Sequence, residues 1–186
     1  MEAIKNIEIN KIVKIILISI VGTLLLTISA KIKIPFYPVP MTMQTFVILF
    51  LGITLGRKIG LITVSLYLFE GIFGLPVFAG TPEKGIGIIY FTGPTMGYLI
   101  GFLVSVYLAG SFKYDKGIGD TFLKLIFSVS FIYILGMIWL GNLIGWEKSI
   151  FKLGAQPFLL AELFKILLLV FLIPTFLKAK KLIKII

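Results

Sequence analysis

The stretch GLPVFAGTPEKGIGIIYFTGPTMGYLIG, residues 74–101, interrupts the apolar sequence near the middle of the chain. It holds seven of the nineteen glycines and three of the eight prolines, but only two charged residues. Water-exposed loops this rich in glycine and proline are usually polar, whereas this one keeps Val77, Phe78 and Tyr90. Irregular backbone is tolerated at membrane depth only where it is buried in protein or lines a cavity. We therefore expect this segment to cover a small-molecule site.

The composition around this stretch is that of an integral membrane protein. Of 186 residues, 59% are hydrophobic and 14% are charged, and the mean hydropathy is +1.10. Soluble domains carry about 25% charged residues, and a spanning helix needs roughly 20 apolar residues. We expect one all-α integral membrane domain, residues 1–186, with six transmembrane helices. Their approximate ranges are 13–30, 42–56, 59–73, 93–112, 123–143 and 158–177.

The basic residues predict the orientation of these helices. Twelve Lys and Arg residues fall in the segments that would be cytoplasmic if the N-terminus is inside, and five fall in the outer loops. Because cytoplasmic loops carry an excess of Lys and Arg, we expect both termini to be cytoplasmic. The same clustering at helix ends accounts for the net charge of +10 without nucleic acid as a partner.

The chain has no cysteine and no histidine. This excludes disulfides, thiolate and imidazole chemistry and the usual zinc ligands. No nucleophile–base set is evident, so the sequence does not indicate an enzyme. We also expect no metal and no cofactor.

Two rows of small residues predict close helix packing. Ser19, Thr23 and Thr27 share one face of the first helix, which packs either within this chain or on a partner subunit. The second row has a small residue at every fourth position of the fourth helix: Gly93, Gly97, Gly101, Ser105 and Ala109.

Three ionisable residues lie in the outer halves of the expected spans, away from their inner ends. Glu162 and Lys165 are three apart and share a helix face, about two turns below its outer end. Charges at such a depth usually face a cavity or each other, so the pair either binds a ligand or forms a mutual salt bridge. Glu70 is one turn from a loop and is either functional or solvated.

Several motifs together resemble the BioY family, the biotin-capturing S-components of energy-coupling factor (ECF) transporters. They cover residues 34–168 in order and include PVPMTMQT, GLPVFAG, GPTMGYLIGF, YILGMIWLG and ELFK. The resemblance implies a six-helix fold that binds biotin near its outer face. The family's usual Asp-x-x-Lys motif maps to Glu162 and Lys165, and its Ala-x-x-x-Ala contact for the coupling protein has no match in the first helix.

The resemblance further implies the protein's surroundings. We expect a multi-pass protein of a prokaryotic cell membrane, in contact with the lipid bilayer. Its partners would be a transmembrane coupling protein and paired ATPases, with biotin as the transported ligand.

The residue types suit biotin independently of the family. Lys165 can donate to a carboxylate, and Glu162 and Gln44 can accept ureido N–H groups. Phe78, Tyr98 and Trp139 can wall the apolar rings. The complete set of expected substrate-binding residues is Glu162, Lys165, Gln44, Phe78, Gly80, Tyr98, Trp139 and Asn142.

Two alternative functions remain open at this stage. An S-component for another small vitamin would share the architecture but not these motifs. A stand-alone ion-coupled carrier would need carboxylates at mid-membrane and usually broken helices in repeated halves. We find no internal repeat in the sequence.

Overall fold

The computed structural model describes residues 2–34, 37–81, 83 and 85–183. Two of the basic residues counted for the membrane orientation, Lys84 and Lys184, lie outside these residues. The described chain is helical apart from one short antiparallel ladder. The elements are α1 (Glu2–Lys31), β1 (Lys33–Ile34), β2 (Met41–Thr42), α2 (Gln44–Ile72), η1 (Gly87–Thr92), α3 (Met96–Ser111), α4 (Ile118–Ile144), α5 (Ile150–Gly154), η2 (Gln156–Phe158) and α6 (Leu159–Ile183).

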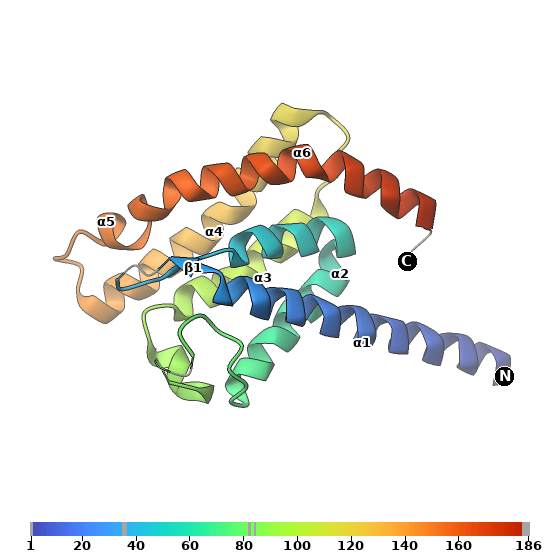
Figure 1. Cartoon of the computed structure of the whole chain (residues 1–186), viewed down its shortest axis with the longest axis horizontal. Helices are drawn as coiled ribbons and strands as arrows, with labels where there is room; N and C mark the ends of the chain where they lie inside the picture. The colour runs from blue at the N-terminus through green and yellow to red at the C-terminus, as the bar shows by residue number, and fades with distance from the viewer. Residues whose placement is uncertain (1, 35–36, 82, 84, 184–186) are drawn as a thin grey trace.

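Helix α2 reverses direction at Gly56 and contains both of the helices expected at 42–56 and 59–73. Gly56 has φ +77° and ψ 171°, a conformation that residues with a Cβ rarely adopt. The two halves then pack closely, since a Cβ on Gly60 would lie 3.5 Å from the Cα of Gly52. Figure 1 shows this turn at the same end of the molecule as both chain termini.

Helix α3 packs between α2 and α4 through its small residues. A Cβ on Gly97 would lie 2.3 Å from the carbonyl oxygen of Leu135, and one on Gly101 would lie 2.6 Å from the Cα of Ile132. This confirms the packing role of the row of small residues. The helix begins at Met96 rather than at Gly93 because the backbone of Gly93 is extended, with ψ 176°.

Helix α1 packs on α2 through the face that carries Ser19 and Thr23. Both side chains are buried, and Thr63 of α2 donates to the Ser19 hydroxyl at 3.3 Å. A Cβ on Gly22 would lie 2.4 Å from the Thr63 methyl group. The face is therefore a contact within the chain, which decides between the two alternatives left open by the sequence.

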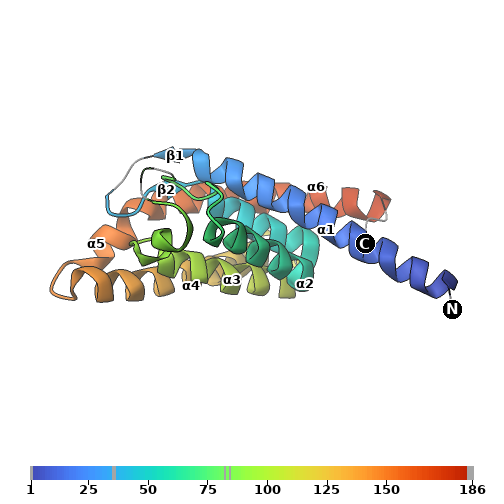
Figure 2. The same ribbon diagram turned by 90° about the horizontal axis from the view of Figure 1, so that it is seen from below.

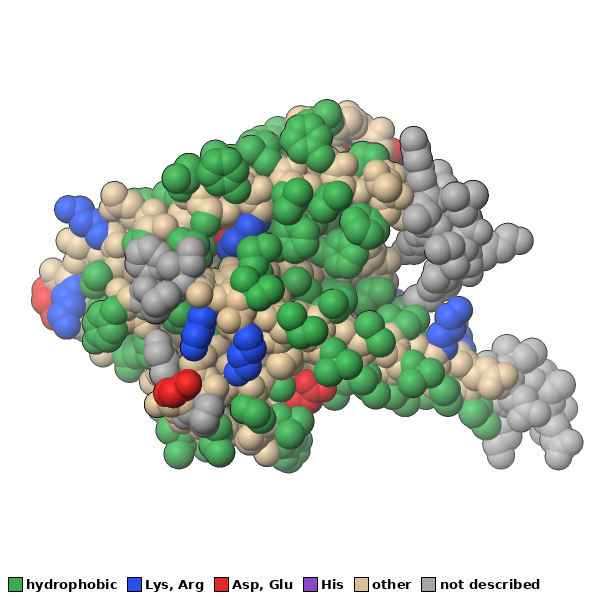
Figure 3. All heavy atoms as spheres, viewed as in Figure 1, with side chains coloured by type: hydrophobic (Ala, Val, Ile, Leu, Met, Phe, Trp, Pro, Cys, Tyr) green, Lys and Arg blue, Asp and Glu red, His purple; other side chains and the backbone are tan. Residues whose placement is uncertain are grey.

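The helices form two layers, shown from the side in Figure 2. Helices α1 and α6 lie on one side, α3 and α4 lie on the other, and α2 reaches both. The buried hydrophobic core runs between them, while hydrophobic side chains also cover much of the outer surface (Figure 3). An apolar outer surface of this extent is expected for a protein in a lipid bilayer.

Four helical stretches among the described residues are long and apolar enough to cross a membrane: Ile9–Lys31, Gln44–Ile72, Ile118–Ile144 and Ile150–Leu177. Helix α3 is apolar but has only 16 residues. An all-helical membrane protein is thus confirmed. The stretch Gln44–Ile72 contains the reversal at Gly56, so its two halves are each shorter than the roughly 20 residues a perpendicular span requires.

Candidate functional site

The loop between α2 and α3, residues 73–95, folds back onto the helices and closes one end of a cavity. We call this segment the α2–α3 loop. Phe78, Ala79 and Tyr90 are buried, whereas Ile88 and Ile89 are exposed. The expectation that apolar residues hold this loop against the protein is therefore confirmed for part of it.

The cavity under this loop has a volume of about 60 Å³. Its walls come from the segment after β1, the loop, α2, α3, α4, η2 and α6. The lining residues are Val39, Pro40, Met41, Thr42, Gln44, Thr45, Phe78, Ala79, Tyr90, Thr95, Tyr98, Leu99, Phe102, Ile132, Tyr133, Phe158 and Lys165. An apolar lining with a few placed polar groups is typical of small-molecule sites.

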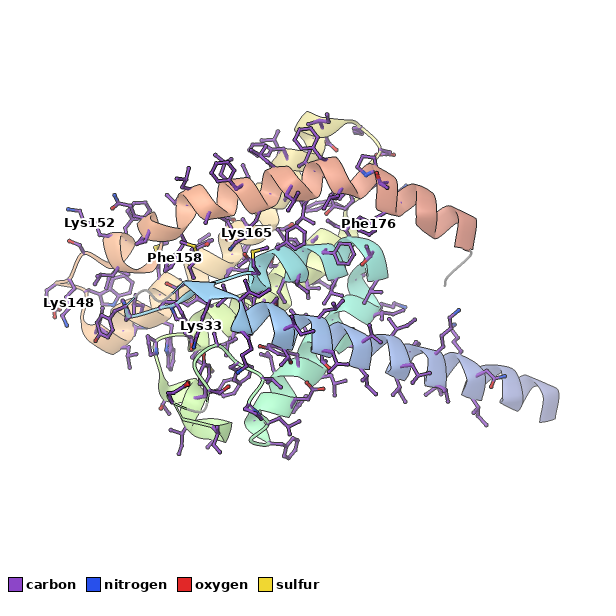
Figure 4. The ribbon with its side chains drawn as sticks, in the orientation of Figure 1. Lys33, Lys148, Lys152, Phe158, Lys165 and Phe176 are labelled. Atoms are coloured by element: carbon purple, nitrogen blue, oxygen red, sulfur yellow. The ribbon has the colours of Figure 1, made fainter. Side chains whose placement is uncertain are left out.

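Lys165 is the cation of this cavity. It projects from α6 toward the β1–β2 ladder (Figure 4), and its Nζ donates to the Thr42 carbonyl at 2.8 Å and to Thr45 Oγ1 at 3.0 Å. The third contact of Nζ is with Glu162 Oε2 at 3.4 Å, which is longer than a usual charge-assisted bond. All three donors of the ammonium are therefore occupied, the weakest of them by Glu162.

Glu162 is buried and lies behind the cavity wall. Its Oε2 accepts from Thr45 Oγ1 at 2.9 Å, from the Tyr133 hydroxyl at 2.8 Å and from Lys165. Its Oε1 is buried with no hydrogen-bond partner among the described residues. The donors around Glu162 are therefore concentrated on Oε2. A buried carboxylate oxygen without a donor, such as Oε1, is energetically unfavourable.

Gln44 connects the cavity to the α2–α3 loop. Its amide Nε2 donates to the Tyr67 hydroxyl at 2.8 Å, and Tyr67 in turn donates to the Val77 carbonyl at 3.0 Å. The Gln44 side-chain oxygen accepts from Thr42 Oγ1 at 3.1 Å, and Thr42 Oγ1 also accepts the Gln44 backbone N–H at 3.3 Å. The amide is therefore held in one orientation at the first turn of α2.

Aromatic side chains form most of the remaining wall. The rings of Phe78 and Tyr90 stack with centroids 4.8 Å apart, and Tyr133 stacks on Phe158 at 6.3 Å. Tyr98 meets Tyr133 edge to face and donates its hydroxyl to the Gly154 carbonyl at 2.7 Å. Burial raises the pKa of the Tyr90 phenol, which keeps this hydroxyl protonated as a donor.

The structure separates the residues expected at the site into two groups. Gln44, Phe78, Tyr98 and Lys165 line the cavity, and Glu162 bonds to one of them. Three others are not among the lining residues: Gly80, Trp139 and Asn142. The Trp139 indole donates to the Gly93 carbonyl at 2.9 Å, and exposed Asn142 accepts from Trp146. Whether any of the eight binds a ligand stays a prediction.

Several lining residues were not identified from the sequence. Thr45 follows Gln44 directly and Tyr133 begins the YILGMIWLG run, so both lay inside motifs without being singled out. A single hydroxyl side chain in an apolar helix gives no periodic pattern in the sequence, because its role depends on a partner from another helix. Glu70 lies at the end of α2 and does not line this cavity.

The described residues contain no group of three or more His, Cys, Asp or Glu side chains that could hold a metal ion. The polar groups of the cavity are an amide, hydroxyls and one ammonium. Such a set recognises an organic ligand that combines N–H donors with an anionic group.

The chain is similar to several known proteins. A family model described as the BioY family matches residues 3–182. A protein from Pyrococcus horikoshii, named a probable biotin transporter BioY, is 34% identical over 142 residues, which cover 76% of this chain and 82% of that protein. A biotin transporter BioY from Thermotoga maritima is 34% identical over 145 residues, with 77% and 84% covered.

A solved structure is similar over nearly the whole chain. The crystal structure of the S-component for biotin from an ECF-type ABC transporter aligns with a TM-score of 0.75 at 30% identity. The alignment covers 91% of this chain and 93% of that one.

Proposed function

The chain belongs to the BioY family, and from that membership we infer that it captures biotin as the S-component of an ECF transporter. It is a transport protein and not an enzyme. The observation that carries this function is the cavity beneath the α2–α3 loop, which combines aromatic walls with Gln44, Tyr133 and Lys165. Biotin offers two ureido N–H donors, an apolar bicyclic ring and a carboxylate to such a set.

We propose that the two polar ends of biotin bind to different groups. Lys165 binds the carboxylate, and Gln44 together with Tyr133, which is bonded to Glu162, binds the ureido ring. Lys165 would meet the carboxylate in place of its long 3.4 Å contact with Glu162, because a ligand carboxylate can approach to the shorter distance of a charge-assisted bond. Gln44 and Tyr133 would accept ureido N–H groups. The Tyr133 hydroxyl donates its proton to Glu162, so its lone pairs remain available to a donor in the cavity.

The small size of the cavity implies that its wall moves when biotin enters. Pockets for ligands of this kind enclose about 300–1,000 Å³, whereas this cavity has a volume of about 60 Å³. The α2–α3 loop is one of the wall elements that belong to no long helix, and it contributes Phe78, Ala79 and Tyr90 between α2 and α3. We propose that this loop opens outward to admit the ligand.

For the finer topology we propose six membrane-embedded helices with both termini on the cytoplasmic side of a prokaryotic plasma membrane. The arrangement supports the proposal because the described ends of α1 and α6 lie at one end of the molecule, and Lys148 and Lys152 lie at the other (Figure 4). A coupling protein and paired ATPases would supply the energy for transport.

Purification in detergent followed by mass spectrometry of the bound small molecule tests the substrate. We expect biotin at near-stoichiometric amounts, and isothermal titration of the ligand-stripped protein should return specific binding of biotin. Recovery of a different vitamin, with no binding of biotin, would contradict the assignment and favour an S-component for that vitamin.

A further inference from the structure

In the stretch 77–81 of the α2–α3 loop, four backbone carbonyls accept side-chain hydrogen bonds, three of them from residues outside the loop. The Val77 carbonyl accepts from Tyr67 of α2, and the Ala79 carbonyl accepts from Tyr90 of η1. The carbonyls of Phe78 and Thr81 both accept from Lys31. The part of the loop that touches the cavity is thus held through its backbone, and Lys31 is its charged anchor.

Lys31 reaches the loop from the last residue of α1, some fifty positions away in the sequence. Its Nζ lies 2.9 Å from the Phe78 carbonyl oxygen, 3.3 Å from the Thr81 carbonyl oxygen and 3.0 Å from Thr81 Oγ1. Thr81 Oγ1 itself donates to the Phe78 carbonyl at 2.8 Å. Three donors of one ammonium therefore converge on one turn of the loop.

The general preference for a cation at a helix C-terminus does not account for this geometry. A basic residue in the last turn interacts favourably with the carbonyls of its own helix. The hydrogen bonds of Lys31 Nζ instead go to the α2–α3 loop. Neither of the two ion pairs among the described residues involves Lys31; its hydrogen-bond acceptors are neutral, and the Glu83 carboxylate of the same loop adds a longer-range attraction.

The residues that Lys31 holds form the wall of the cavity. Phe78 and Ala79 both line it, and the Phe78 ring is pressed against α2, where a Cβ on Gly71 would lie 2.0 Å from the ring. Gly74 and Gly80 have φ of +92° and +84°, and glycine loses more conformational freedom on ordering than other residues. A loop of this composition needs external hydrogen bonds to keep its shape.

We propose that Lys31 is a positioning residue that holds the α2–α3 loop closed and thereby sets the rates at which ligand enters and leaves the cavity. Lys31 does not itself line the cavity, so it acts through Phe78 and Thr81 rather than through a contact with ligand. The ligand part of this inference rests on the proposed function. The part concerning the loop does not.

The test is Lys31→Met, which keeps the aliphatic stem and removes the donors. Loss of hydrogen bonds from a charged group changes an opening equilibrium by roughly 10- to 100-fold. We expect the dissociation of labelled biotin, chased with unlabelled biotin, to accelerate by about that factor. Association should accelerate in the same direction because the loop also opens for entry, so Kd should change less than either rate.

The matched control is Lys33→Met, at the same end of the molecule (Figure 4). The Lys33 side chain makes no hydrogen bond in the part of the chain that the structure describes, and the Lys33 backbone pairs with Thr42 in the β1–β2 ladder. Its variant should keep wild-type rates. Lys31→Arg retains a cation and N–H donors and should restore most of the slow dissociation. Thr81→Val removes one acceptor of Lys31 and the Thr81 donor to the Phe78 carbonyl, but leaves both backbone carbonyls that Lys31 binds, so it should give a smaller acceleration.

Hydrogen exchange in the ligand-free protein separates this inference from the proposed function. Amides of residues 77–81 should exchange faster in Lys31→Met than in the wild type or in Lys33→Met. Faster exchange in Lys31→Met, in a protein that binds no biotin, would support Lys31 as the anchor of the loop and refute biotin as the substrate. Unchanged exchange together with unchanged biotin dissociation would overturn the inference. So would a weaker Kd that comes from dissociation alone, because that pattern indicates direct contact with ligand.

Discussion

Glu162 and Lys165 place opposite charges 3.4 Å apart in a buried part of the protein, where their side chains are only 4% and 8% exposed. Desolvation of such a pair can offset its Coulombic attraction, so stability alone gives a weak reason for its presence. Both charges are surrounded by hydroxyl partners from α2 and α4 and by a carbonyl of β2. At the scale of single residues, the question is which of these partners the ligand replaces.

Substitution of Lys165 tests its assignment to the carboxylate. Lys165→Met keeps the length of the side chain and removes the charge, so it should weaken biotin by about 1.5–3 kcal/mol, as for a hydrogen bond to a charged group. The same substitution should weaken binding of the neutral amide of biotin far less. Glu162→Gln should weaken both ligands alike. Titration calorimetry measures all four affinities, and an equal loss for biotin and its amide in Lys165→Met would identify the pair as a structural salt bridge.

Tyr133 provides a second test at the same scale. Its hydroxyl donates to Glu162 Oε2 at 2.8 Å while the residue lines the cavity. Tyr133→Phe should therefore weaken biotin by about 0.5–1.5 kcal/mol, the usual net contribution of one hydrogen bond. A biotin methylated on one ureido nitrogen should be less sensitive to the change. Tyr107→Phe, at a tyrosine that is 42% exposed, is the control, and a Kd in Tyr133→Phe equal to that of the control would remove Tyr133 from the site.

At the scale of elements, two glycine-dependent features shape the helices around the cavity. The reversal at Gly56 returns α2 toward the end that holds the cavity, and the contacts of Gly97 and Gly101 bring α3 against α4. Gln44 and Tyr67 belong to opposite halves of α2 and meet at 2.8 Å only because of that reversal. The polar relay from the cavity to the loop thus depends on one backbone conformation 12 positions away from Gln44.

Gly56→Ala should destabilise the protein through backbone strain alone. No atom lies within 4 Å of a Cβ placed there, but φ +77° with ψ 171° lies in a region almost restricted to glycine, which costs alanine about 1–3 kcal/mol. Gly119→Ala is the matched control, since its added Cβ also meets nothing within 4 Å and its φ is ordinary. Thermal unfolding in detergent should show a lower Tm for Gly56→Ala and an unchanged or higher Tm for Gly119→Ala. Equal Tm values would show that the turn tolerates a side chain.

At the scale of the whole molecule, the charge distribution and the fold agree on which segments share an end. The Gly56 turn packs on the end of α3, since a Cβ on Gly110 would lie 2.4 Å from the Arg57 backbone nitrogen. The α2–α3 loop lies at the opposite end (Figure 1), and its residues Phe78, Ala79 and Tyr90 line the cavity. This arrangement puts the basic inner turns and the ligand site on opposite sides of the proposed membrane.

Single cysteines at positions 116 and 148 test that orientation, because the natural chain has none. By the positive-inside rule, we expect an impermeant maleimide to label Lys148→Cys in intact cells and Lys116→Cys only after permeabilisation. Both variants should label fully in detergent, which controls for reactivity. Labelling of Lys116→Cys alone in intact cells would invert the topology.

The sequence by itself determined the class of protein, the position of most helices and the residue pairs that lie close along one helix. Hydropathy and helical spacing are local properties, so the membrane class and the shared face of Glu162 and Lys165 followed from them. The glycine-rich stretch also indicated a loop against the protein. Only the tertiary structure decided that the α1 face that carries Ser19 packs within the chain and that the Trp139 indole donates to the Gly93 carbonyl.

The same limit applies to the contacts that define the site. Lys31 meets Phe78 across 47 positions, Tyr133 meets Glu162 across 29 and Lys165 meets the Thr42 carbonyl across 123. Such contacts depend on how each helix is rotated and how closely it packs on its neighbours. Close approach at Gly97 and Gly101 fixes α3 against α4, and a rotation of one residue, about 100° in a helix, would direct Tyr133 away from the cavity.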